Sequence, residues 1–68
     1  MKIVGIVTFK NKMYWLDNEG SGLPGVDILD NGKWRDALTI EVDLFDLLER
    51  GHKREGTKED YTENPFEN

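Results

Sequence analysis

Few side chains of this sequence are of the kinds that carry out catalysis. The chain contains no cysteine, and its one histidine, His52, begins a polar C-terminal segment, whereas Ser21 lies in a glycine-rich loop. Because a nucleophile needs a base within hydrogen-bonding reach, no such pair is predicted. Carboxylates are numerous, but nothing in their spacing places two of them in a water-excluded cleft where their pKa values would separate. We therefore expect that the protein is not an enzyme and uses no cofactor.

The loop over residues 17–25 resembles metal and phosphate sites only in part. Its acidic start is similar to that of a calcium loop, but the twelfth position is Ile28, where a bidentate glutamate is needed. Its three glycines are followed neither by a long helix nor by the lysine of a phosphate-binding loop. We expect a turn-rich loop and no metal site.

The balance of charge favours binding to a protein. The chain carries 9 Lys and Arg residues against 14 Asp and Glu residues, a formal net charge of −5, so its field repels phosphate groups. A protein with a basic surface is the expected partner, and nucleic acid is disfavoured. A charged rim beside an exposed aromatic ring gives a small interface both steering and an anchor. The predicted partner-binding residues lie on the outward face of an expected helix over 43–50: Asp43, Phe45, Asp46 and Glu49.

Two clusters of aromatic and basic residues support an alternative hypothesis. In one, two aromatic residues follow Lys10 and Lys12. In the other, Trp34 lies between two basic residues. Aromatic rings among basic side chains stack on the bases of single strands, so a nucleic-acid-binding module is the second functional class considered. In so small a protein the same rings are also expected as core residues. The alternative site comprises Tyr14, Trp15, Lys33, Trp34 and Arg35.

These residues are expected to be positioned by β-strands and tight turns. Residues 1–10 are rich in β-branched side chains with apolar positions on both parities, which predicts a strand covered on both faces. Further strands are expected over 13–16 and 26–29. Lys10 to Lys12 predicts one tight hairpin, and Asn31-Gly32 predicts a second, of type I′, whose return strand begins at Trp34.

The periodicity changes near residue 43. Residues 38–42 alternate between apolar and polar side chains, which predicts a strand with one buried face. Leu44, Leu47 and Leu48 then recur at helical spacing, with Asp43 placed to cap the first turn and Gly51 placed to end the helix. We expect a helix of about two turns whose leucines face the sheet.

The fold class expected from these elements is mainly β, of the α+β type. A single small domain over residues 1–51 would hold a curled antiparallel sheet of four or five strands, closed or covered by the helix over 43–50. An SH3-like sheet is one form of this fold, and a flatter sheet with the helix across one face is the alternative. Residues 52–68 mix charges of both signs with few apolar side chains, which predicts a disordered acidic tail.

Length and composition set the expected environment and functional class. No apolar stretch approaches the about 20 residues of a membrane helix, and the lack of cysteine is typical of the cytoplasm. In a domain of this size, apolar burial and conformational entropy nearly cancel, so we expect stabilisation by a partner or by homo-oligomer formation. The predicted function is a small acidic binding protein that modulates or inhibits another macromolecule. By analogy of class, phage-encoded modulators of host nucleic-acid enzymes are proteins of this kind.

Overall fold

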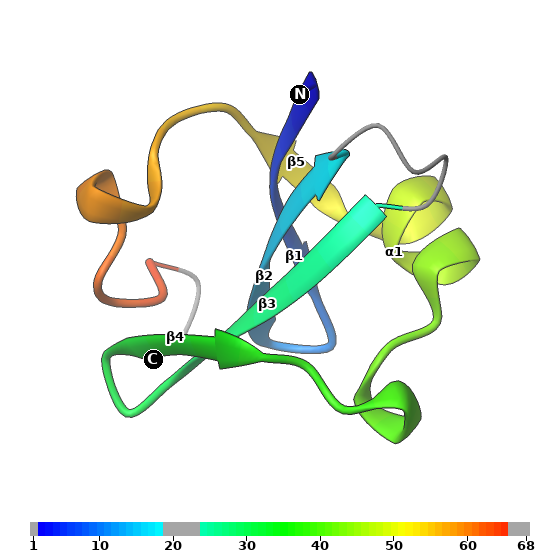
Figure 1. The fold of residues 1–68 in the computed structure, drawn as a ribbon, viewed down its shortest axis with the longest axis horizontal. Helices are drawn as coiled ribbons and strands as arrows, with labels where there is room; N and C mark the ends of the chain where they lie inside the picture. The colour runs from blue at the N-terminus through cyan, green and yellow to red at the C-terminus, as the bar shows by residue number, and fades with distance from the viewer. Residues whose placement is uncertain (1, 19–23, 66–68) are drawn as a thin grey trace.

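The computed structural model describes residues 2–18 and 24–65, so the predicted loop residues 19–23 and the end of the predicted tail, 66–68, lie outside it. The strands form one open antiparallel sheet in the spatial order β4-β3-β2-β1-β5 (Figure 1). The mainly β prediction is confirmed, whereas the SH3-like form stays a prediction. The strands are β1 (Lys2–Phe9), β2 (Lys12–Asn18), β3 (Pro24–Asp30), β4 (Lys33–Asp36) and β5 (His52–Arg54), and the helices are η1 (Thr39–Glu41), α1 (Leu44–Arg50) and η2 (Lys58–Asp60).

Both predicted hairpin turns are confirmed. Lys10 and Asn11 join β1 to β2 with φ angles of 52° and 62°, and Asn31 and Gly32 join β3 to β4 with φ angles of 52° and 76°. Two consecutive positive φ angles define the type I′ turn, whose twist matches that of the flanking strands. These turns place β1 beside β2 and β3 beside β4, and β2 pairs antiparallel with β3.

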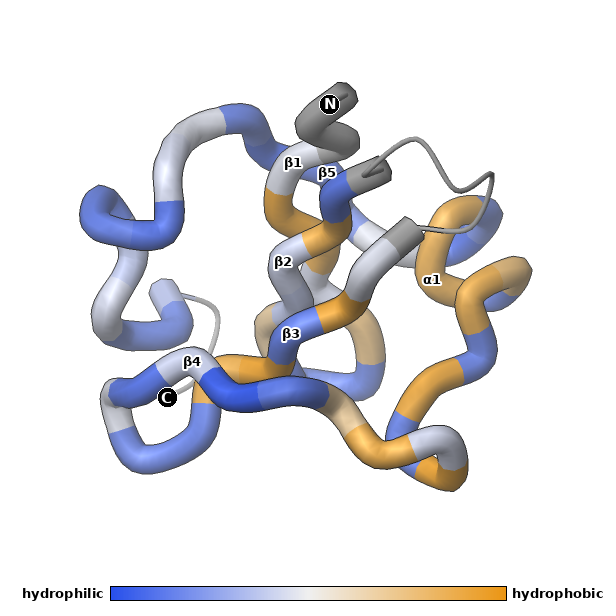
Figure 2. The backbone as a smooth tube through the Cα atoms, in the orientation of Figure 1, coloured by the Kyte–Doolittle hydropathy of each residue, from blue (hydrophilic) through white to orange (hydrophobic). Residues whose placement is uncertain are grey.

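The sheet has a hydrophobic cluster on each face, as the apolar residues of both parities in β1 predict. On the first face, the buried cluster comprises Val7, Tyr14, Leu16 and Ile28 from the strands and Leu47 from α1. On the second face, Ile6, Met13 and Trp15 are buried. In Figure 2, α1 and the C-terminal segment lie on opposite sides of the strands. The first cluster is therefore covered by α1, and the second is covered by the C-terminal segment.

The helix prediction is confirmed at both ends. Asp43 caps α1, since its Oδ1 accepts a hydrogen bond from the Asp46 N–H at 3.3 Å. The Gly51 N–H donates to the Leu47 carbonyl oxygen at 3.1 Å and ends the helix. Leu47 is buried against the sheet, with Leu44 and Leu48 partly buried beside it. No helix among the described residues is long and apolar enough to cross a membrane.

The predicted strand over 38–42 is wrong. β4 ends at Asp36, and residues 39–41 form the 3-10 turn η1. The Glu41 N–H donates to the Leu38 carbonyl oxygen at 2.8 Å, which closes the turn locally instead of pairing with a neighbouring strand. Alternating hydrophobicity reports burial only where a partner strand exists, and here the chain leaves the sheet to cross to α1.

Regular structure also continues beyond the predicted end of the domain. Residues 52–54 form the edge strand β5, which pairs antiparallel with residues 6–8 of β1. Residues 55–65, here called the C-terminal strap, include η2 and carry Tyr61 against the second hydrophobic cluster. The prediction that residues 52–65 lack regular structure is therefore wrong for β5 and η2. The C-terminal strap contains few apolar residues, but the ring of Tyr61 and the backbone carbonyl oxygens of Lys58 and Tyr61 hold it against the sheet.

Two side chains of the sheet hold the C-terminal strap. The indole N–H of Trp34 donates to the carbonyl oxygens of Lys58 and Tyr61, at 3.2 Å and 3.0 Å. The Lys58 ammonium group pairs with the Asp27 carboxylate. Because these contacts join residues more than twenty positions apart, no local pattern in the sequence reveals them.

Candidate docking surface

The segment from Leu38 to Glu49, here called the docking flank, exposes three large apolar side chains. Leu38 is 59% exposed, Ile40 92% and Phe45 71%, and these are the exposed large hydrophobic residues of the part of the chain that the structure describes. The orange colour of apolar residues recurs along this flank in Figure 2, from the end of β4 to α1. Exposed apolar side chains grouped in this way mark interaction surfaces more often than scattered ones do.

Contacts of Glu41 hold the turn that exposes Ile40. Both carboxylate oxygens of Glu41 accept hydrogen bonds from the guanidinium group of Arg35, each at 2.9 Å. The Leu38 N–H donates to Glu41 Oε1 at 2.7 Å, and the Tyr14 hydroxyl donates to the Glu41 carbonyl oxygen at 3.2 Å. These contacts fix the turn to β4 and to β2, while the side chain of Ile40 is exposed to solvent.

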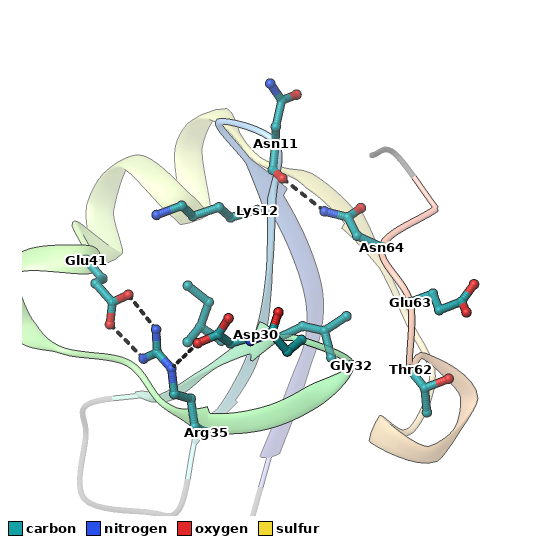
Figure 3. Close-up of a pocket in the computed structure, with 12 residues that line it drawn as sticks. Asn11, Lys12, Asp30, Gly32, Arg35, Glu41, Thr62, Glu63 and Asn64 are labelled. Carbon is teal, nitrogen blue, oxygen red and sulfur yellow. Dashed lines mark hydrogen bonds and ion pairs between the residues drawn. The ribbon is translucent and has the colours of Figure 1, made fainter. Parts of the chain in front are cut away.

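Arg35 joins two carboxylates on the same face of the sheet. Its Nε donates to Asp30 Oδ2 at 3.0 Å, so the guanidinium group lies between Asp30 and Glu41 (Figure 3). The hydrogen bonds from Arg35 and from the Leu38 N–H lower the pKa of Glu41 from 4.5 to about 2. The same two carboxylates raise the pKa of Arg35. Burial, reinforced by the charge of Glu41, raises the pKa of Tyr14.

The four residues predicted to bind a partner lie together on α1 and at its cap. Phe45 and Glu49 are one helical turn apart on the outward face, and both are exposed. Asp43 is exposed at the cap, and Asp46 is half-buried, with its carboxylate 3.9 Å from the Arg50 Nε. The structure therefore places an acidic rim beside an exposed aromatic ring.

Leu38 and Ile40 are exposed apolar residues of the docking flank that the sequence patterns did not indicate. Sequence reasoning assigned both to the buried face of a strand, because their alternation with polar residues is typical of one. The feature that overrides this pattern is the bidentate contact from Arg35 to Glu41, which closes the turn. A contact between side chains six positions apart has no signature in hydrophobic periodicity.

The residues of the alternative site are not brought together on an exposed surface. Tyr14 and Trp15 are only 3% and 5% exposed and belong to the clusters on opposite faces of the sheet. The indole of Trp34 is held by the C-terminal strap, and Arg35 is paired with two carboxylates. Only Lys33 is exposed without a described role. In this arrangement the aromatic rings serve the core, and stacking on bases finds no support.

In the part of the chain that the structure describes, two cavities border the docking flank. The larger, of about 690 Å³, lies between the two hairpin turns and the C-terminal strap, and Arg35 and its two carboxylate partners are among the residues that line it (Figure 3). The smaller, of about 430 Å³, lies between the β1–β2 hairpin and the junction of η1 with α1. Within the described residues, no group of three His, Asp or Glu side chains could hold a metal ion.

Comparisons of the chain with protein-family models, with curated protein sequences and with solved structures return no match. The candidate surface therefore rests on its own geometry.

Proposed function

We propose that the protein is a small acidic binding protein that docks onto another macromolecule through the docking flank. The observation that carries this proposal is Ile40, an apolar side chain that is 92% exposed on a turn fixed by several hydrogen bonds. Burying such a side chain against a partner is favourable, and little conformational entropy is lost because the turn is already ordered.

The charges around this anchor support a partner with a basic surface. Asp43, Asp46 and Glu49 surround Phe45, and the whole chain carries a net charge of −5. Complementary charge accelerates association and disfavours acidic partners. Proteins that bind nucleic acids present basic surfaces of this kind, so modulation or inhibition of such a protein in the cytoplasm is the form of the function that we favour.

The test is affinity capture from a bacterial lysate with a variant that leaves the cap of α1 intact. The variant combines Ile40→Ser, Phe45→Ser, Asp46→Lys and Glu49→Lys, and it keeps Asp43 because its carboxylate caps the helix. The matched control changes Glu59 and Glu63, both exposed outside the docking flank, to Lys and therefore has the same net charge.

We expect the wild-type chain and the control to capture one basic protein that the flank variant, still folded by circular dichroism, no longer captures. Capture of the same proteins by all three chains would contradict the proposal, because it would show that the flank does not take part in binding.

A further inference from the structure

The smaller cavity is lined partly by the docking flank and partly by residues of the β1–β2 hairpin, which lie outside the flank. It forms a groove of about 430 Å³ between the β1–β2 hairpin and the η1–α1 junction. The hairpin contributes Phe9, Lys10 and Lys12 to one side, and the junction contributes Val42, Asp43 and Asp46 to the other. We call this cavity the charged groove.

The two sides of the charged groove carry opposite charges. Lys10 and Lys12 are exposed on the hairpin side, where the Lys10 ammonium lies 5.1 Å from the centroid of the Phe9 ring. On the junction side, Asp43 is exposed and the Asp46 side chain is 35% exposed. Glu41 also lines the groove, but its carboxylate is already held by Arg35. Asp43 uses one oxygen to cap α1 and Asp46 lies 3.9 Å from Arg50 Nε, so the exposed remainder of these two carboxylates forms the acidic side.

The base of the charged groove is apolar. Phe9 and Val42 are partly buried against the first hydrophobic cluster, and Tyr14 is buried within it. The Tyr14 hydroxyl is used in its hydrogen bond to the Glu41 carbonyl oxygen. Ile40 also lines the groove and extends the apolar surface towards solvent. An apolar side chain is thus the fitting occupant for the centre of the groove.

We propose that the charged groove binds a short peptide segment of the partner protein in which an apolar side chain lies between a basic and an acidic residue. This inference rests on the proposed function and specifies the segment that is recognised. The basic residue pairs with Asp43 and Asp46, and the acidic residue pairs with Lys10 and Lys12. A segment with charges of one sign is disfavoured, because one side of the groove repels it.

The test uses synthetic peptides and the full chain labelled with ¹⁵N. The probe is a capped peptide with two arginines, a central leucine-phenylalanine pair and two glutamates, made in both charge orders. Three matched peptides replace the arginines by glutamine, the glutamates by glutamine, or the apolar pair by serine. Amide chemical shifts locate binding on the protein and give its affinity.

Protein variants test each side of the groove separately. One variant carries Asp43→Asn and Asp46→Asn, since asparagine also caps helices well. The other carries Lys10→Asn and Lys12→Gln, since Lys10 has a φ of 52° and asparagine tolerates this left-handed conformation. The control carries Lys33→Gln and Glu59→Gln, two exposed positions outside the groove.

We expect one charge order of the full peptide to shift amides over 9–14 and 40–46. Its affinity should fall several-fold with either charge-neutralised peptide or groove variant, and at least about tenfold when the apolar pair is replaced. The control should bind the full peptide as the wild-type chain does.

The proposal is overturned if no peptide shifts these amides at millimolar concentration, or if the groove variants bind as the wild type does. It is also overturned if the same amides shift with protein concentration alone, because a second copy of the chain would then occupy the groove. In each of these cases a flank-dependent capture from lysate would leave the proposed function standing, and loss of that capture would end both.

Discussion

At the scale of single residues, Glu41 decides the shape of the candidate surface. Its carboxylate accepts hydrogen bonds from Arg35 and from the Leu38 N–H, and its carbonyl oxygen accepts one from Tyr14. Hydrogen bonds between ionised partners are stronger than those between neutral groups, and the bidentate form also fixes geometry. One side chain thereby fixes a turn that leaves Ile40 exposed.

The low pKa of Glu41 predicts an acid-sensitive contribution to stability. Because the pKa falls from 4.5 to about 2 on folding, the ionised carboxylate stabilises the folded state above pH 4.5, and this contribution disappears as the pH falls towards 2. Glu41→Gln should therefore lower the free energy of unfolding at pH 7 and weaken its decline between these two values. Urea unfolding followed by circular dichroism over this pH range measures both effects.

The control for this prediction is Glu59→Gln, which changes an exposed carboxylate of η2. It should leave the decline of stability with falling pH unchanged. An unchanged decline in the Glu41→Gln chain would mean that the contact with Arg35 does not persist in solution.

Gly51 is required by close packing at the junction of α1 and β5. A β-carbon at this position would lie 1.9 Å from Val7 Cγ1 and 2.6 Å from the Leu47 carbonyl oxygen. Gly51→Ala should therefore lower the free energy of unfolding by about 3 kcal/mol, since overpacking forces the core and backbone to shift. Urea unfolding measures this loss.

Gly32→Ala provides the comparison. Gly32 has a φ of 76°, and within residues 2–18 and 24–65 its added β-carbon would meet only the Thr62 carbonyl oxygen, at 3.5 Å. Its cost should be about 1 kcal/mol, from the left-handed backbone alone. Equal losses in the two variants would show that α1 does not pack closely on β1 at Gly51.

At the scale of elements, η1 and α1 differ in what forms them. α1 depends on local features, namely the Asp43 cap and the helical spacing of its leucines, so its position was predictable. η1 depends on Arg35, which belongs to β4, and on Tyr14, which belongs to β2. The periodicity of residues 38–42 was therefore misleading, because the side chains that override it come from other strands.

The exposure of Ile40 predicts which apolar residues stabilise the protein. Ile40→Ser should change the free energy of unfolding by less than about 0.5 kcal/mol, as surface substitutions usually do. Leu47→Ala should lower it by about 2–5 kcal/mol, because the Leu47 side chain of α1 is buried against the sheet. Chemical unfolding of both variants gives the comparison. A large loss for Ile40→Ser would restore the strand prediction, in which this side chain is buried.

At the scale of the whole molecule, the sheet is stabilised from both faces. The first cluster is covered by α1 and the second by the C-terminal strap. A small domain buries little apolar surface, so the loss of either cover removes a large share of its stability. Tyr61 contributes its ring to the second cluster, and its hydroxyl donates to the Glu55 carbonyl oxygen at 3.1 Å.

Removal of residues 57–68 should therefore destabilise the fold. Exposure of the side chains of the second cluster should lower the free energy of unfolding by at least about 3 kcal/mol, at the usual cost of exposing buried apolar side chains. The tryptophan emission should move to longer wavelength as Trp15 and Trp34 meet water. Urea unfolding and fluorescence measure these two changes.

Two substitutions in the full chain separate packing from chain length. Tyr61→Ala should reproduce part of the loss, and Tyr61→Phe, which keeps the ring, should stay close to the wild type. A shortened chain with unchanged stability and emission would support the flexible tail that composition predicts.

Features that depend on neighbours along the chain could be predicted from the amino-acid sequence. These are the type I′ turn at Asn31-Gly32, the strand over residues 2–9, which buries Val7 on one face and Ile6 on the other, and α1 with its cap. The acidic net charge is also a property of the sequence, and a partner with a basic surface is expected from it, whereas the absence of cysteine led to the expectation of a cytoplasmic environment. The acidic rim of the docking flank belongs to this group, since Phe45 and Glu49 share a helix face by spacing alone.

Features that depend on residues distant in sequence could not be predicted in this way, because they arise from contacts formed in the folded chain. Arg35 turns residues 38–41 out of the sheet and leaves Ile40 exposed, and Trp34 holds the C-terminal strap over the second face. The charged groove likewise arises where the β1–β2 hairpin meets the η1–α1 junction. Hydrophobic periodicity records how strongly a side chain avoids water, but whether that side chain is buried depends on the element that covers it.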